Sequence, residues 1–192
     1  MFNIVTPCCR PQNLPAIEAS IRRQGVPLSD ITWWICYDKN PLTGIVKVSD
    51  HDGLKVYEGN YTSKTSVAGH GQRNACLDNM LDMDSWFYSV DDDNIMPDNF
   101  LREVANTSNT DAVIVDQINK EGVYRLYASP ERMTVCNIDT AQFIVKRGLI
   151  GDLRFIASDY CADGLFIEAL YKASPEKFTF INKPLCYYNY LA

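Results

Sequence analysis

The sequence is short of histidine, of paired cysteines and of positive charge. Only two of the 192 residues are histidines, and the seven cysteines include no Cys-x-x-Cys pair. A structural zinc site needs four Cys or His ligands at close spacing, so we expect none. Scattered single cysteines are typical of small buried side chains in a reducing compartment. We therefore expect all seven to be reduced and none to act in catalysis.

The charge balance excludes one large class of partner. Asp and Glu number 24 against 18 Lys and Arg, for a formal net charge of -6. A nucleic-acid-binding protein needs a basic surface to neutralise phosphates, so we expect no nucleic-acid partner. The charge does not exclude a nucleotide ligand, because one metal ion and one or two arginines neutralise a diphosphate locally.

Long hydrophobic runs are also missing. No apolar stretch approaches the roughly 18 residues that a membrane span needs, and the first residues, MFNIVTPCCRP, lack the basic and apolar regions of a signal peptide. We expect a cytoplasmic protein without a membrane span, at most peripheral on a membrane.

Strand-like and helix-like patterns alternate along the chain, which indicates an α/β fold. The predicted strands cover 2–6, 31–37, 54–57, 86–90, 112–115, 123–128, 133–145 and 178–181. The predicted helices cover 13–23, a segment led in by 68–74 that buries Leu77, Met80 and Leu81, and then 98–105 and 163–173. With no repeat or linker, the pattern predicts one domain of 192 residues with a mostly parallel central sheet.

In open α/β sheets, ligands bind at the carboxyl ends of the strands. The segments that follow the first, second and fourth predicted strands are rich in polar residues. They carry Thr6, Pro7, Arg10, Asp38 and the triplet 91–93. We expect these residues to share one edge of the sheet.

The strongest chemical signal is Asp91-Asp92-Asp93, directly after a predicted strand. Alternation along a strand places Asp91 and Asp93 on one side and Asp92 on the other. Two carboxylates at one strand end repel each other unless a cation lies between them, and hard oxygen ligands select Mg²⁺ or Mn²⁺. The alternative is a solvated acidic turn that caps the next helix.

Two further signals are weaker when taken alone. Glycines before the Arg73 helix let the backbone approach an anionic ligand that Arg73 could contact, or they only shape a turn. Asp163 starts a predicted helix, where a carboxylate serves as a cap or, beside a sugar pocket, as a general base.

Five segments together resemble the family-2 glycosyltransferases of the GT-A fold, in order from Asn3 to about Tyr171. The opening strand with its Thr-Pro turn, Asp38 after the second strand, GHGQRN, SVDDDN and Leu153-Arg154-Phe155 with Asp163 are similar to that family's motifs. The resemblance implies a GT-A domain, a Rossmann-like sandwich, with a nucleotide-binding half at about 1–95 and an acceptor-binding half at about 96–192.

The resemblance also implies a role for each candidate residue. Asp163 is the catalytic base of an inverting transfer, and Asp93, with Asp91, holds Mn²⁺ or Mg²⁺. Asp91 or Asp92 reaches the donor ribose, and Arg73 lies near the phosphates or the base. The residues implied around the nucleobase are Thr6, Pro7, Arg10 and Asp38. Those implied for the acceptor are Asp139, Thr140, Gln142 and Asp159. Ala162 departs from the Glu that the family carries there, which makes Asp159 the candidate for part of that role.

The implied partners are a nucleotide-sugar donor, in first place a UDP-sugar, and a glycan or other hydroxyl acceptor. Two alternatives stay open. A sugar-nucleotide nucleotidyltransferase needs a glycine-rich, basic loop after its first strand, which residues 6–11 do not form. A non-catalytic module that binds sugar nucleotides would have no need of Asp163.

Overall fold

Nine strands form one sheet within residues 1–39, 44–61 and 65–192, the parts of the chain that the computed structural model describes. The strand order is β3-β4-β2-β1-β5-β8-β6-β7, and β9 pairs with β6. The strands are β1 Phe2–Cys8, β2 Ile31–Tyr37, β3 Gly44–His51, β4 Leu54–Asn60, β5 Trp86–Ser89, β6 Ala112–Asn119, β7 Tyr124–Leu126, β8 Phe143–Lys146 and β9 Phe178–Tyr188.

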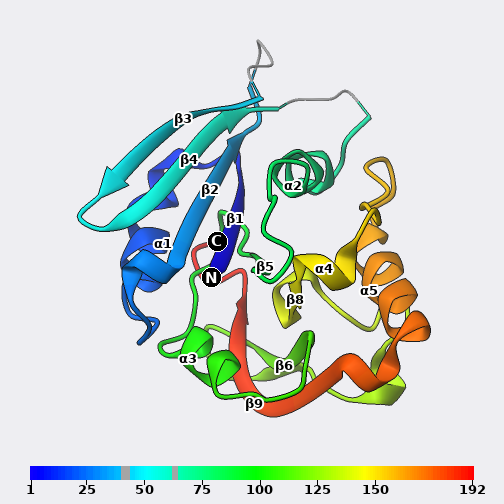
Figure 1. Cartoon of the computed structure of the whole chain (residues 1–192). Coiled ribbons are helices and arrows are strands. Elements are labelled where there is room, and N and C mark those ends of the chain that lie inside the picture. Colours follow the sequence, from blue (N-terminus) through cyan, green and yellow to red (C-terminus); the bar gives the residue numbers. More distant parts are fainter. Residues whose placement is uncertain (40–43, 62–64) are drawn as a thin grey trace.

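The helices lie on both faces of this sheet (Figure 1). Their bounds are α1 Leu14–Ile21, α2 His70–Leu77, α3 Phe100–Ala105, α4 Arg147–Ile150 and α5 Ala162–Ala173. Strands β4, β2, β1 and β5 run parallel, as do β6 and β9, while β3, β7 and β8 pair antiparallel. More residues pair in parallel than in antiparallel ladders, so the expectation of a mostly parallel α/β sheet is confirmed.

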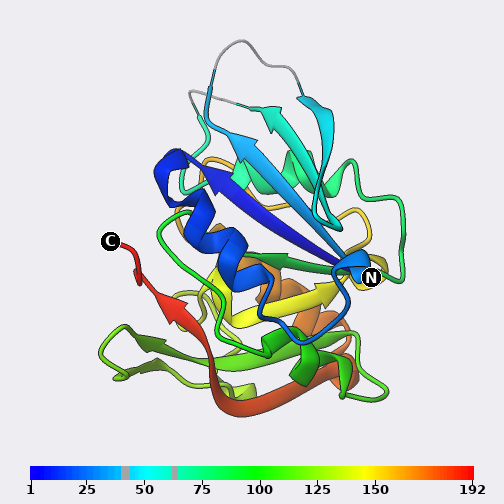
Figure 2. The same ribbon diagram turned by 90° about the vertical axis from the view of Figure 1, so that its left-hand side faces the viewer.

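Side-chain alternation along the buried strands builds two apolar cores. In β2, Trp33 and Ile35 face the core that contains Ile17 and Ile21 of α1, while Trp34 faces the opposite core. Helix α3 joins the first core, and α2 and α5 join the second. Figure 2 shows α1 in front of the sheet, alongside β1. The near-continuous apolar runs of the central strands follow from this burial on both faces.

The structure corrects several predicted element bounds. Strand β3 was not predicted, because its Lys47-Val48-Ser49-Asp50 segment is largely polar and lies at the sheet edge. The predicted strand over 133–145 is reduced to β8, since Cys136 has a left-handed backbone (φ 69°) that interrupts an extended run. Helix α2 ends at Leu77, and Leu81, expected to be buried, is 86% exposed.

The turn before α2 brings the helix start against the end of β1. Gly69 adopts a left-handed conformation (φ 75°), and a Cβ built there would lie 2.6 Å from Cβ of Pro7. Only glycine combines this backbone with such a close approach. The structure thus contains the predicted glycine turn, and the backbone of this turn packs against β1.

We expect Gly69→Ala to destabilise the fold by about 2–4 kcal/mol, because it combines backbone strain with a steric overlap. Gly53→Ala is the matched control: Gly53 also has a positive φ (89°), but nothing lies within 4 Å of its built Cβ. Its cost should stay near 1 kcal/mol, the backbone term alone. Chemical denaturation measures both, and equal losses would show that the contact with Pro7 carries no weight.

Candidate functional site

The parallel strands end at one edge of the sheet, as the sequence predicts. Cys8 pairs with Tyr37, and Tyr37 pairs with Asn60, so the loops after β1, β2 and β4 leave at the same level. The loop after β5 joins them, since Cys9 and Arg10 bond to Asp92. Two adjoining cavities open here.

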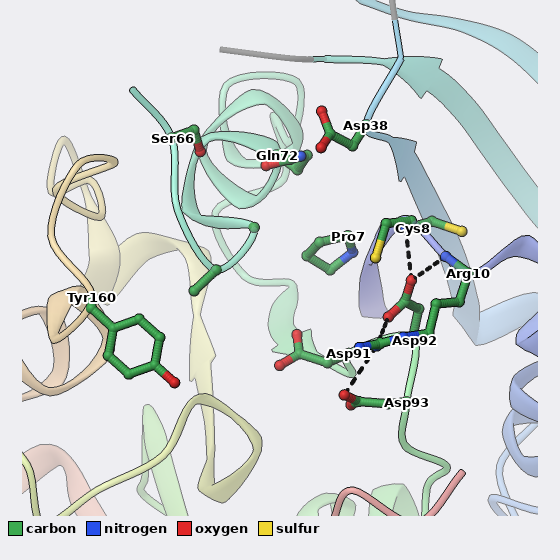
Figure 3. Close-up of a pocket in the computed structure, with 13 residues that line it drawn as sticks. Pro7, Cys8, Arg10, Asp38, Ser66, Gln72, Asp91, Asp92, Asp93 and Tyr160 are labelled. Carbon is green, nitrogen blue, oxygen red and sulfur yellow. Dashed lines mark hydrogen bonds and ion pairs between the residues drawn. The ribbon is translucent and has the colours of Figure 1, made fainter. Parts of the chain in front are cut away.

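The first cavity, called the β1 pocket, has a volume of about 420 Å³ (Figure 3). It is walled by the loops after β1, β2 and β5, by the start of α2 and by the exposed ring of Tyr160. Its main polar lining residues are Arg10, Asp38, Ser66, Gln72, Asp91, Asp92 and Asp93. Of the predicted nucleotide-binding residues, Pro7, Arg10, Asp38, Asp91 and Asp92 come together in this pocket.

The second cavity, called the α5 pocket, has a volume of about 470 Å³ and lies on the other side of Asp91 and Asp93, which line both cavities. Thr140, Asp139 and Asp163 form part of its wall, together with Arg73 and Arg125. The two cavities thus meet at the aspartate pair.

Asp92 is turned away from that junction. It is 4% exposed, and its carboxylate accepts hydrogen bonds from the backbone N–H groups of Cys9 (2.6 Å) and Arg10 (2.5 Å). The Arg10 guanidinium bridges Asp92 (2.7 Å) and Asp93 (3.0 Å). Figure 3 shows Asp91 and Asp92 pointing in opposite directions. The predicted division of the triplet agrees with this arrangement, although the three residues follow β5 as a turn.

Asp91 is held by Arg73, which is 1% exposed and also bonds to Ser89 Oγ (2.9 Å) and to the carbonyl of Ala68 (2.5 Å). The Asp91 side chain keeps 41% of its surface accessible and is only partly buried where it lines the two pockets. This burial raises the pKa of Asp91 to about 6 against the opposing charge of Arg73, and the carboxylate of Asp139 raises it further.

Asp163 lies in the first turn of α5 and is partly buried in the α5 pocket. Its carboxylate accepts from its neighbour's N–H at Gly164 (2.8 Å) and from Thr140 Oγ (3.4 Å). Burial raises the pKa of Asp163 above its usual range. A raised pKa makes a carboxylate a stronger base, which suits proton abstraction from a hydroxyl.

At the junction of the two pockets, two carboxylates are available as protein ligands for a divalent cation. Asp91 and Asp93 both face it, and burial and the neighbouring carboxylates destabilise the ionised form of Asp91. Within 1–39, 44–61 and 65–192, no three His, Cys, Asp or Glu residues are grouped to hold a metal. Mg²⁺ and Mn²⁺ are commonly held by one or two carboxylates plus substrate oxygens, so this donor set is sufficient.

Four predicted site residues lie elsewhere or are already engaged. Thr6 is buried and accepts from the Trp33 indole, and Gln142 is buried and donates to the Val115 carbonyl. Neither is among the residues that line the two pockets, and neither is Asp159. Arg73 lines the α5 pocket, but its guanidinium is bonded as described above.

Several lining residues were not predicted. Tyr160 lines both pockets, and Gln72 lines the β1 pocket. Arg125 reaches the α5 pocket from β7 and lies 3.9 Å over the Tyr188 ring. No local motif marks Tyr160 or Arg125, whereas Gln72 lies within the GHGQRN segment beside the predicted Arg73.

The cysteines are all free, as expected. Cys8, Cys36, Cys76 and Cys186 are buried, but Cys9 and Cys136 are exposed, which corrects the expectation that all seven are buried. The sulfur atoms of Cys136 and Cys161 lie 3.7 Å apart at the α5 pocket.

No protein-family model and no curated protein matches the sequence, but solved structures do. TarS 1-349 of S. aureus superposes with a TM-score of 0.68 at 15% identity, over 97% of this chain and 59% of that one. Its complex with UDP-GlcNAc gives 0.70 at 15%, over 97% and 58%. The mannosyltransferase PcManGT from Pyrobaculum calidifontis, in complex with GDP-Man and Mn²⁺, gives 0.67 at 13%, over 98% and 56%.

The fold is that of GT-A glycosyltransferase domains. The expected fold is thereby confirmed, and at these identities the likeness carries the fold alone. The chain spans between 56% and 59% of the length of the three solved chains, and the ligands in those structures are ligands of those proteins. None of the helices in the described part of this GT-A domain has the length and apolar composition that crossing a membrane requires.

We expect Asp92→Ala to lower the stability of the GT-A domain by about 2–4 kcal/mol, because it leaves two loop N–H groups and a guanidinium without their acceptor. For a domain of this size the melting temperature should fall by roughly 5–15 °C. Asp38→Ala removes an exposed carboxylate from the same pocket and should change stability by no more than about 0.5 kcal/mol. Similar melting temperatures for both variants would contradict the structural role of Asp92.

Proposed function

We propose that the chain is a metal-dependent inverting glycosyltransferase that moves a sugar from a nucleotide diphosphate donor to a hydroxyl acceptor. A UDP-sugar is the first candidate donor, and a saccharide is the first candidate acceptor. The observation that carries the proposal is the shared wall of the two pockets: Asp91 and Asp93 line both. A diphosphate bound at this wall leaves its nucleoside in one pocket and its sugar in the other.

The β1 pocket suits the nucleotide. Arg10, with its side chain 46% exposed, supplies a cation beside Asp93, where the phosphates would lie. Asp38 lies beyond Pro7, at the end of the pocket away from the aspartate triplet (Figure 3). The UDP-GlcNAc complex of TarS and the GDP-Man and Mn²⁺ complex of PcManGT support a nucleotide-sugar donor on this fold. Residues 1–95 would then form the donor half.

Asp93 and Asp91 would hold the divalent metal, with donor oxygens as its further ligands. A bound divalent ion neutralises the charge that develops on the leaving diphosphate. Arg73 keeps Asp91 oriented toward the junction, and Arg10 does the same for Asp93. The two carboxylates are thus positioned before any ligand arrives.

The α5 pocket suits the acceptor and the reacting carbon. Asp163 would take the proton from an acceptor hydroxyl as its oxygen bonds to the anomeric carbon and the bond to the diphosphate breaks. Thr140, 3.4 Å from the Asp163 carboxylate, would orient it. Asp139, which pairs with Arg125 at 3.1 Å, lines the same wall, and 96–192 would form the acceptor half.

Nucleotide binding should require metal. We expect UDP or GDP with Mn²⁺, at about a hundredfold excess over the dissociation constant, to stabilise the domain by roughly 2.7 kcal/mol. The melting temperature should rise by on the order of 5–10 °C. The measurement is a thermal shift with Mn²⁺ and, as its control, the same nucleotide in excess EDTA. An equal rise in EDTA would remove the metal from the mechanism.

Asp93 and Asp163 should fail in different ways. Asp93→Ala removes a metal ligand, so calorimetry should show loss of metal–nucleotide binding together with loss of turnover. Asp163→Asn keeps shape but cannot accept a proton, so nucleotide binding should persist while kcat falls by about 10²–10⁴-fold.

Asp159→Asn is the matched control on the same segment. It should be active, because the Asp159 side chain accepts from the Cys161 N–H and lines neither pocket. If Asp159→Asn is inactive while Asp163→Asn is active, the catalytic base is Asp159 and not Asp163. The products formed from a sugar nucleotide distinguish the alternatives. Release of pyrophosphate would indicate a nucleotidyltransferase, and release of free nucleoside diphosphate would indicate a glycosyltransferase. Release of neither product would indicate a non-catalytic binding module.

A further inference from the structure

Cys136 and Cys161 place two neighbouring thiols, called the thiol pair, in the wall of the α5 pocket. Their Sγ atoms lie 3.7 Å apart, although the two residues are 25 positions apart in the chain. Cys136 is exposed and Cys161 is partly exposed, so small molecules in solution have access to the pair. Cys36 and Cys76 also share a thiol hydrogen bond, but both are fully buried in the core. The thiol pair therefore combines close contact with access.

The backbone is held in place on both sides of the thiol pair. The N–H of Cys161 donates to the Asp159 carboxylate (2.8 Å), and the N–H of Val135 donates to the Glu168 carboxylate of α5 (3.1 Å). The segment before Cys136 also packs closely on α5, since a Cβ built at Gly164 would lie 3.0 Å from Cα of Val135. Two reacting groups held together in this way react as if within one molecule, without the cost of an encounter.

A low-molecular-weight disulfide can oxidise the thiol pair by exchange. The hydrogen bond to Cys136 raises the pKa of the Cys161 thiol, so the more exposed Cys136 attacks first. Its thiolate bonds to one sulfur of the small disulfide, and the other sulfur leaves as a thiolate that takes up a proton. The Cys161 thiolate then attacks the Cys136 sulfur of this mixed disulfide and releases the second small thiol. The thiol pair thus loses two electrons and two protons, which the small disulfide gains.

The disulfide would join two segments that carry the chemistry of the α5 pocket. Asp163 follows Cys161 by two residues, and Thr140, 3.4 Å from the Asp163 carboxylate, follows Cys136 by four. The sulfur atoms, 3.7 Å apart as free thiols, would move to the S–S bond length of about 2.05 Å. This draws the start of α5 and the segment before Thr140 toward each other. Displacement of a catalytic group by about 1 Å can lower the rate by about 100-fold.

We propose that the thiol pair is a redox modification site, at which a low-molecular-weight disulfide forms a reversible Cys136–Cys161 disulfide that lowers turnover. The effect on turnover rests on the proposed function, whereas formation of the disulfide does not. In a reducing compartment such a disulfide is transient, and it acts as a sensor of oxidation. Neither cysteine lines the β1 pocket, so nucleotide binding should not change.

Oxidation of the reduced protein with oxidised glutathione, followed by alkylation and tryptic mass spectrometry, tests the proposal. The disulfide should link the peptides 133–146 and 155–172, each of which contains one cysteine. We expect kcat to fall at least about tenfold on oxidation and to return with dithiothreitol. The affinity for UDP with Mn²⁺, measured by calorimetry, should be the same before and after oxidation.

Two serine variants and one control identify the sulfur atoms. Cys161→Ser should form no link, and its kcat should be the same before and after oxidation. Cys136→Ser should behave in the same way, and it keeps the result decisive if Cys161→Ser does not fold. Cys9→Ser removes an exposed thiol outside the pair, so the link between 133–146 and 155–172 should still form.

Mixed disulfides with glutathione, or links between molecules, in place of the Cys136–Cys161 link would overturn the inference. So would a link that leaves kcat unchanged in an active enzyme. If the link forms in a protein that is inactive even when reduced, the proposed function fails together with the effect on turnover, while the modification site is confirmed.

Discussion

The ion pair between the buried guanidinium of Arg73 and the partly exposed carboxylate of Asp91 is the interaction on which the site depends. Arg73 is 1% exposed and joins three elements: α2, the end of β5 through Ser89, and the left-handed turn at Ala68. Loss of Asp91 would leave the buried guanidinium of Arg73 without its counter-charge, which is unfavourable. The pair therefore fixes α2 against the aspartate triplet and, with it, the wall between the two pockets.

The three aspartates at 91–93 are chemically identical, but each has a different role in this arrangement. Asp91 is bound to Arg73, Asp92 organises the loop after β1 through the N–H groups of Cys9 and Arg10, and Asp93 stays at the junction beside one exposed guanidinium. The burial that raises the pKa of Asp91 is the cost of gathering carboxylates where a cation would be bound. An arrangement that destabilises its own charges in the absence of a ligand is typical of a functional site.

Sequence reasoning reached the fold and part of the site. The apolar run of β2 and the period of α1 predicted their elements, because burial alone decides them. Strand β3 was missed because it is an edge strand with a polar middle. The segment 133–145 was overpredicted because its apolar residues Met133 and Ile138 are buried in the same core as α5 without being part of a strand. Tyr160 and Arg125 were missed because long-range folding alone brings them to the pockets, and Gln72 was missed although it lies within the GHGQRN segment.

The sequence by itself determined most of the central strands and helices and the edge at which Pro7, Arg10, Asp38 and the aspartates meet. Each of these follows from local periodicity or chain direction, which neighbouring residues set. Only the tertiary structure decided that Thr6 and Gln142 form internal hydrogen bonds and that Arg73 forms an ion pair with Asp91. Such pairings depend on residues far apart in the chain, and no spacing in the sequence encodes them.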